Sequence, residues 1–159
     1  MKNTFRIIVI SDTHKNISNA TDIITAEKPD YVLHLGDLED DADQLRYIFD
    51  RTEIINVCGN CDWGGFSNAP TERMLDIGGV KILMCHGHTY SVKNGVEHYR
   101  LTAKEKGADI ALFGHTHIPM YEHNGDIALM NPGTVSTYGW IEIADGGFKA
   151  GVNAFGELK

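Results

Sequence analysis

The chain has 159 residues, of which 42% are hydrophobic and 23% are charged. This balance is ordinary for a protein with one buried core, and it excludes a disordered tail, a collagen-like repeat and a disulfide scaffold. The 14 basic and 22 acidic residues give a net charge of −8. Because long nucleic acids and anionic membranes both require a basic surface, we expect neither as a partner.

The sequence also favours a single domain over residues 1–159, located in the cytoplasm. No apolar run approaches the roughly 20 residues that span a bilayer. The N-terminal segment reaches Asp12 without the small-residue cleavage site of a signal peptide. Cys58 and Cys61 have the spacing of a redox pair or half a zinc site, but Cys58 and Cys85 each end an apolar run and are expected to be small buried hydrophobes.

In the first half of the chain, short β-branched runs alternate with amphipathic segments. The run at 5–11 is too dense in Ile and Val for a strand that faces solvent. This order of elements is typical of parallel strands joined by helices. We expect strands at 5–11, 31–36 and 53–59, and helices at 17–27 and 41–50.

The second half is richer in strands. Gly78 and Gly79 separate two alternating runs, which is typical of a hairpin, and a helix is expected at 95–106. Further strand-like segments cover 109–114, 120–131 and 140–152, the last two with internal turns. Together the two halves predict a layered α/β domain with mixed sheets.

Five of the apolar runs are followed by residues that can bind a metal ion. Ligands of open α/β sheets collect where the carboxyl ends of neighbouring strands meet. One such residue alone is ordinarily a helix cap or a hydrogen-bonded side chain, but five strand ends together predict a metal site. Asp12 and His14 follow 5–11, Asp37 follows 31–36, Asn60 and Asp62 follow 53–59, His86 and His88 follow 80–85, and His115 and His117 follow 109–114.

The chemistry of these side chains restricts the metal. Carboxylate, imidazole and one amide oxygen suit Mn, Fe, Zn, Co or Ni. Seven candidate ligands (Asp12, His14, Asp37, Asn60, His86, His115 and His117) exceed the demand of one tetrahedral ion. They fit two ions that share a carboxylate, an arrangement used for phosphoryl displacement.

The ordered series SDTH, GD, GNCD, HGH and GHTH, followed by NPGT at 131–134, resembles the calcineurin-like metallophosphoesterase superfamily. It is most similar to the small, single-domain phosphodiesterases of bacteria and archaea. The resemblance implies an α/β fold, a layered β-sandwich of two mixed sheets flanked by helices, with the site at one edge. It further implies two divalent ions, most simply Mn²⁺, with Ni²⁺, Fe²⁺, Co²⁺ or Zn²⁺ as alternatives. Asp12, His14, Asp37 and His117 would hold the first ion, and Asp37, Asn60, His86 and His115 the second.

We therefore expect a phosphodiesterase that hydrolyses a small phosphodiester. Two carboxylates against two divalent ions leave a formal charge of about +2, which suits attack of metal-bound hydroxide on the phosphorus of an anionic ester. Larger relatives carry a histidine where this chain has Cys61, and a neutral thiol is a poor general acid. Asp62 and His88 are candidates for that role, and hydrogen bonding to the ligands is the alternative for both.

Two other functions stay open. One is a catalytically weak, protein-binding scaffold of the same fold, although the complete set of ligands argues against lost chemistry. The other is a phosphomonoesterase or protein phosphatase, although no arginine pair lies near the motifs to grip a dianionic ester. The sequence leaves a homo-oligomer open as well.

Overall fold

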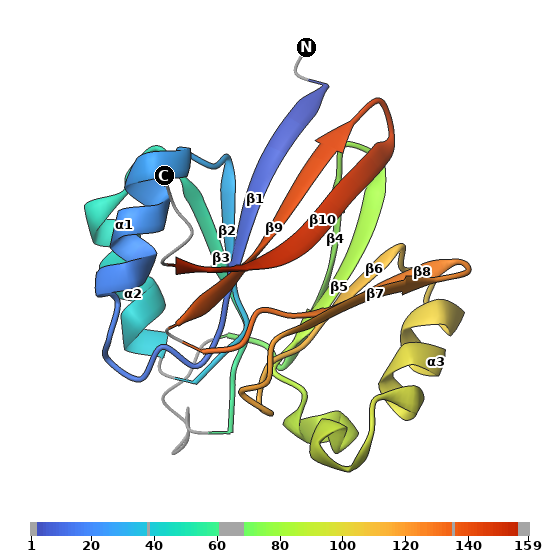
Figure 1. Ribbon diagram of the computed structural model, residues 1–159. Coiled ribbons are helices and arrows are strands. Elements are labelled where there is room, and N and C mark those ends of the chain that lie inside the picture. The colour runs from blue at the N-terminus through green and yellow to red at the C-terminus, as the bar shows by residue number, and fades with distance from the viewer. Residues whose placement is uncertain (1–2, 38, 61–68, 135, 156–159) are drawn as a thin grey trace.

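The computed structural model describes residues 3–37, 39–60, 69–134 and 136–155. Strands and helices alternate up to β3, and strands dominate afterwards, as the sequence predicts (Figure 1). In chain order the elements are β1 (Thr4–Ile10), α1 (Ser18–Glu27), β2 (Tyr31–His34), α2 (Glu39–Ile48), β3 (Glu53–Asn56), β4 (Glu72–Ile77), β5 (Val80–Cys85), the 3₁₀ turns η1 (His88–Tyr90) and η2 (Val92–Asn94), α3 (Glu97–Glu105), β6 (Ile110–Leu112), β7 (Met120–Asn124), β8 (Ile127–Asn131), β9 (Thr137–Ala144) and β10 (Gly147–Ala154).

The strands form two five-stranded sheets that pack face to face (Figure 1). The first sheet has the order β10-β9-β1-β2-β3, with β1, β2 and β3 parallel and the β9–β10 hairpin antiparallel. The second has the order β4-β5-β6-β8-β7, with β5, β6 and β8 parallel between antiparallel edge strands. The predicted layered sandwich of two mixed sheets is therefore confirmed.

Strand β1 shows why its sequence is continuously apolar rather than alternating. Ile7 and Val9 face the core between the sheets, where they meet Ile82 of β5. Ile8 and Ile10 face the other way and pack with Ile23 of α1. Both faces of the strand are covered, so every position from 7 to 10 is buried.

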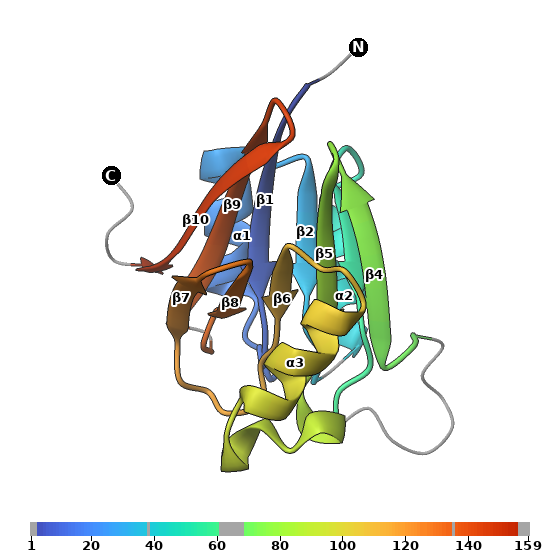
Figure 2. The ribbon, with the colours of Figure 1, turned by 90° about the vertical axis from the view of Figure 1, so that its right-hand side faces the viewer.

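The helices cover the outer faces of the two sheets. Helices α1 and α2 lie against the first sheet, and α3 lies against the second (Figures 1 and 2). Tyr99 of α3 is fully buried there, and its hydroxyl donates to the carbonyl of Leu112 at 2.6 Å. None of the helices within the described residues combines the length and apolar character that crossing a bilayer requires.

Several strands are shorter than the sequence predicts. The segment expected at 53–59 is a strand only over Glu53–Asn56, and the one expected at 109–114 only over Ile110–Leu112. In both cases the chain leaves the ladder early to form a loop that carries candidate ligands. The helix expected from residue 95 begins at Glu97, because the backbone of Gly95 (φ 128°, ψ 156°) is not helical.

Candidate metal centre

The candidate ligands lie on the loops that follow β1, β2, β3, β5 and β6, at one edge of the sandwich (Figure 1). The backbone of these loops is unusual, because five of the candidate ligands have a positive φ. A left-handed conformation costs a residue other than glycine roughly 1–3 kcal/mol and is typical of functional sites. The five are Asp12 (φ 55), His14 (46), Asp37 (61), His115 (67) and His117 (64).

The carboxylate of Asp12 is fully buried and only half satisfied. Its Oδ2 accepts hydrogen bonds from the Ser11 hydroxyl at 2.7 Å and the His115 backbone N–H at 3.1 Å. Its Oδ1 makes no hydrogen bond with the part of the chain that the structure describes. Three imidazole nitrogens surround Oδ1 instead: Nε2 of His117 at 3.2 Å and Nε2 of His14 and of His86 at 3.8 Å each.

The tautomer of His86 is fixed by the main chain. Its Nδ1–H donates to the carbonyl of Leu35 at 2.8 Å, so Nε2 of the neutral ring carries a lone pair. This nitrogen lies 3.4 Å from Oδ2 of Asp37. A histidine whose second nitrogen is held by a carbonyl in this way is typical of metal ligands.

Asn60 joins the same group. One terminal atom of its amide lies 2.9 Å from His86 Nε2, 3.2 Å from His115 Nδ1, and 3.1 and 3.3 Å from the two Asp37 oxygens. An amide nitrogen at that position donates to these acceptors. An amide oxygen there makes the lone pairs of all four groups converge, an arrangement that a cation satisfies.

His115 is suited to the neutral form that metal binding requires. Burial lowers its pKa, and the nearby charges of His86 and Lys93 lower it further. Its Nδ1 lies 3.2 Å from His86 Nε2, and the two rings meet nearly edge to face at 5.0 Å. The lowered pKa favours the neutral His115 ring, which is the form that donates a nitrogen lone pair to a metal ion.

The described side chains form two groups that can each hold a metal ion. Asp12, His14 and His117 form one group, and Asp12, Asp37 and His86 form the other, with the ligand atoms of each within 4.8 Å of one another. The chemistry of these donors fits divalent cations, because carboxylate oxygens and imidazole nitrogens are ligands that such ions prefer.

Three comparisons with known proteins bear on this arrangement. Residues 5–143 match the model of the calcineurin-like phosphoesterase superfamily domain. The chain belongs to the calcineurin-like phosphoesterase superfamily. A probable metallophosphoesterase of Methanocaldococcus jannaschii is 34% identical over 136 residues, which cover 82% of this chain and 68% of the relative. A phosphodiesterase of the same organism is 27% identical over 150 residues, which cover 84% and 86%.

Solved structures share the fold of this chain. A predicted phosphoesterase from Streptococcus pneumoniae superposes with a TM-score of 0.78 at 28% identity, covering 98% of this chain and 92% of the other. Vacuolar protein sorting 29 from Cryptosporidium parvum superposes with a TM-score of 0.75 at 18% identity, covering 94% and 97%. As a calcineurin-like phosphoesterase, the chain is a hydrolytic enzyme of a metal-dependent family.

The structure brings all seven expected ligands of this phosphoesterase to one edge. Asp12 is the carboxylate common to both ligand groups, whereas the resemblance gave the shared position to Asp37, which stays a prediction. His88 lies beside the site, with its ring 5.5 Å from that of His86 and 6.2 Å from that of His115. Cys61 and Asp62 lie outside the described residues.

Sequence reasoning missed the contacts that hold the ligand loops. The buried amide of Asn131 donates to the Gly114 carbonyl at 3.1 Å and to the Thr116 hydroxyl at 2.8 Å, which fixes the loop that carries His115 and His117. The available signal was the NPGT motif, which begins at Asn131. At Gly59, a Cβ atom would clash with the backbone nitrogen and Oδ1 of Asp37, so the loops after β2 and β3 approach too closely for any side chain there.

Proposed function

We propose that this phosphoesterase is a dinuclear, metal-dependent phosphodiesterase that acts on a small phosphodiester. The observation that carries the proposal is the buried Oδ1 of Asp12, which has no hydrogen-bond donor among the described residues and is surrounded by imidazole nitrogens. Burying such an oxygen is unfavourable unless a proton or a cation neutralises it.

The residues that would hold the two ions follow from the grouping of side chains and from the family resemblance. Oxygen and imidazole donors of this kind suit Mn²⁺, with Fe²⁺, Co²⁺, Ni²⁺ and Zn²⁺ as alternatives. Bound ions would stabilise the negative charge that develops on the phosphate and lower the pKa of water. We assign Asp12, His14, Asp37 and His117 to one ion and Asp37, Asn60, His86 and His115 to the other.

The charge of the site supports an anionic ester as the substrate. Asp12 and Asp37 are the two carboxylates of the set, and the lowered pKa of His115 keeps that ring neutral at neutral pH. Two divalent ions would therefore leave a formal charge of about +2. A phosphodiester monoanion reduces that charge without requiring further cationic side chains, and a relative that covers most of this chain is called a phosphodiesterase.

The residues of the chain itself have defined tasks in this proposal. Ser11 and the His115 backbone hold Oδ2 of Asp12, so that Oδ1 points toward the imidazoles. The Leu35 carbonyl orients His86. His88 lies within ring-contact distance of two proposed ligands and is assigned to neither ion. We propose that His88 donates a proton to the leaving group as the general acid, with Asp62 and Cys61 as the other candidates.

The proposal is tested by hydrolysis of bis(p-nitrophenyl) phosphate after metal removal and Mn²⁺ addition. We expect turnover that a chelator abolishes and Mn²⁺ restores. Asp37→Ala should lower turnover by about 100-fold or more. His123→Ala is the matched control, because this exposed histidine of β7 stacks on Phe148 rather than facing the site. Full turnover by Asp37→Ala protein would contradict the proposal.

The alternatives give different results in the same assay. A protein-binding scaffold would bind Mn²⁺ and turn over no ester, and a phosphomonoesterase would prefer p-nitrophenyl phosphate to the diester. The likeness to vacuolar protein sorting 29 concerns the fold alone, so it does not decide between them.

A further inference from the structure

A hydrogen-bonded network of buried polar side chains lies next to the candidate metal centre. Thr13 is 3% exposed, His34 is fully buried, and Asp41 is 1% exposed. The Thr13 hydroxyl lies 3.0 Å from Nε2 of His34 and 2.5 Å from Oδ2 of Asp41. None of the three belongs to the proposed ligand set.

The direction of each hydrogen bond in this network can be deduced. The backbone N–H of Gly36 donates to Nδ1 of His34 at 3.1 Å, so that nitrogen carries no proton. The neutral ring therefore carries its proton on Nε2 and donates it to the Thr13 hydroxyl oxygen. The Thr13 hydroxyl in turn donates to Asp41, whose carboxylate only accepts.

This hydrogen-bonded network contacts two ligand loops, the first at Thr13 and the second at Gly36. Thr13 stands between Asp12 and His14, and Gly36 precedes Asp37. The backbone N–H of Asp12 also donates to the Gly36 carbonyl at 3.2 Å, so the loop after β1 is joined to the end of β2 and its loop both here and through the contact of Thr13 with His34. The buried network thus connects loops that carry ligands proposed for both ions.

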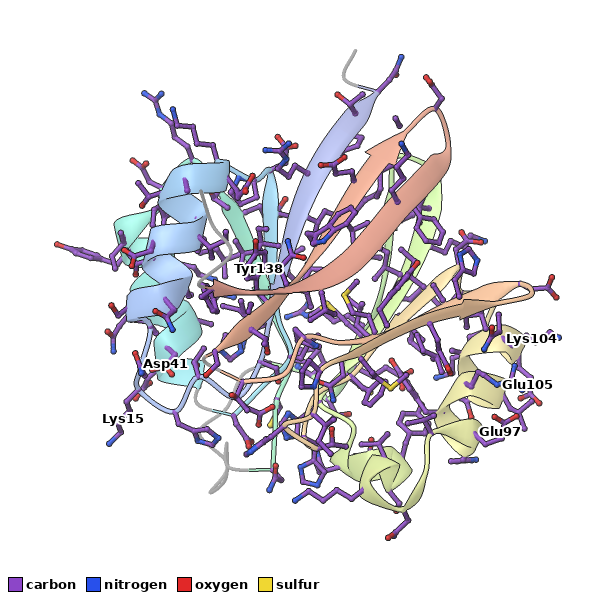
Figure 3. The ribbon with its side chains drawn as sticks, viewed as in Figure 1. Lys15, Asp41, Glu97, Lys104, Glu105 and Tyr138 are labelled. Atoms are coloured by element: carbon purple, nitrogen blue, oxygen red, sulfur yellow. The ribbon has the colours of Figure 1, made fainter. Side chains whose placement is uncertain are left out.

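Asp41 also holds the far side of the first loop. Its Oδ2 accepts a second hydrogen bond, from the backbone N–H of Lys15 at 2.8 Å. The Lys15 side chain points away from the molecule, while Asp41 lies beside it at the start of α2 (Figure 3). Asp12, His14 and Lys15 have φ values of 55°, 46° and 70°. Such a conformation persists only where surrounding contacts enforce it.

An ordinary role at a helix terminus does not account for Asp41. Acidic residues in the first turn of a helix commonly interact with the helix dipole while exposed to solvent. Asp41 is buried instead, and both hydrogen bonds that its Oδ2 accepts come from the loop after β1. The carboxylate is therefore directed at the ligand loop.

We infer that Asp41 and Thr13 are positioning residues, which hold the loop that carries Asp12 and His14 in its metal-binding conformation and tie it through His34 to the loop that carries Asp37. The inference rests on the proposed function, because it assumes that these residues bind metal. Contacts of this kind behind metal ligands commonly affect metal affinity by 10- to 100-fold.

The test measures the Kd for Mn²⁺ alone, by calorimetric titration without substrate. Thr13→Val keeps the shape of the side chain and removes the hydroxyl, and we expect its Kd to rise by about tenfold or more. Thr13→Ser restores the hydroxyl and should return the Kd to within about twofold of the original. Asp41→Ala should behave like Thr13→Val. Asp41→Asn keeps an acceptor oxygen for Thr13 and Lys15, and should weaken binding less.

A matched control separates positioning from general stability. Tyr99→Phe also removes a fully buried hydroxyl that is hydrogen-bonded, but on the α3 side of the molecule. It should lower the melting temperature in chelator and leave the Kd for Mn²⁺ unchanged. Whichever of Thr13→Val and Asp41→Ala melts above the assay temperature is used for the comparison.

The outcomes are distinct. An unchanged Kd in Thr13→Val or Asp41→Ala, with the original chain binding Mn²⁺, overturns this inference and leaves the proposed function standing. Failure of the original chain to bind Mn²⁺ overturns the proposed function and this inference with it. A raised Kd that serine at position 13 does not rescue also overturns the role of the hydroxyl.

Discussion

The two ends of the sandwich follow different rules. At the end that carries the turns of the β7–β8 and β9–β10 hairpins, positive φ values fall on Gly125, Asp145 and Gly146, residue types that tolerate them, and on Lys28 after α1. At the ligand edge, positive φ values are more numerous and include three histidines and Lys15 as well as Asp12 and Asp37. The same edge buries a carboxylate oxygen without a donor among the described residues. Strain and unsatisfied charge are thus concentrated where chemistry is proposed, and the rest of the fold stabilises them.

Among substitutions at the ligand edge, Asp12→Asn should have the largest effect on activity. An amide keeps the acceptor for Ser11 and His115 and replaces Oδ1 by a donor. We expect at least about 100-fold lower diester turnover with Mn²⁺. In chelator, the free energy of unfolding should rise by about 1 kcal/mol, because a buried unsatisfied oxygen is lost. Activity assays and chemical unfolding check the two effects, and unchanged turnover would show that Asp12 is not a ligand.

Metal binding should relieve the same unsatisfied charge. At a Mn²⁺ concentration of 100 times Kd, the native state gains about 2.7 kcal/mol. For a chain of this size that raises the melting temperature by roughly 5–10 °C. The measurement is a thermal melt with Mn²⁺ and with chelator. Asp12→Asn protein should show little of this rise, and an equal rise in that variant would place the ion elsewhere.

Two glycine substitutions compare the ends of the molecule directly. Gly59→Ala puts a methyl group against the backbone and carboxylate of Asp37, so it should cost roughly 1–3 kcal/mol and also weaken Mn²⁺ binding. Gly125→Ala meets no atom within 4 Å, but its φ is 65°, so strain alone should cost roughly 1–2 kcal/mol. Mn²⁺ titration and unfolding of both variants check this, and a loss of affinity in Gly125→Ala would contradict the contrast.

The smallest expected effect at neutral pH concerns Cys85, at the boundary between core and ligand loop. Burial raises the pKa of its thiol to about 12, from 9.0 in the unfolded chain. The folded state therefore favours the neutral thiol, and this contribution to stability is complete below pH 9 and is lost as the pH rises toward 12.

Thiol labelling followed by peptide mass spectrometry measures the protection of Cys85. In the native protein Cys58, which is partly exposed, should react before Cys85. Equal rates for the two would contradict the burial of Cys85. Unfolding above pH 9 provides the second check, because Cys85→Ala protein should lose stability with pH less steeply.

Much of this fold could be predicted from the sequence because its signals are local. Apolar runs such as 5–11 and 31–36 predict strands, and Gly78-Gly79 predicts the β4–β5 hairpin, which pairs Ile77 with Val80. The ligand edge was predictable for a similar reason, since parallel strands bring their carboxyl ends together. The ends of β3 and β6 were less predictable, because leaving the ladder there depends on contacts within the loops.

The supports of the site were not predictable, because each joins residues far apart in the sequence. Asp41 lies 28 residues from Thr13, and Asn131 lies 17 residues from Gly114. In the sequence, Asp41 is one acid in a run of acids before a helix, and only the folded chain distinguishes it from its exposed neighbour Asp40. The periodicity of apolar residues and the spacing of motifs carry no information about such pairs.

Diffraction from a crystal soaked in Mn²⁺, with anomalous data collected at the manganese edge, would locate the bound ions. We expect two anomalous peaks at the ligand edge, one among Asp12, His14 and His117 and one among Asp37, Asn60, His86 and His115. Peaks that lie away from these side chains, or no peak at this edge in protein shown to contain manganese, would contradict the proposed metal centre.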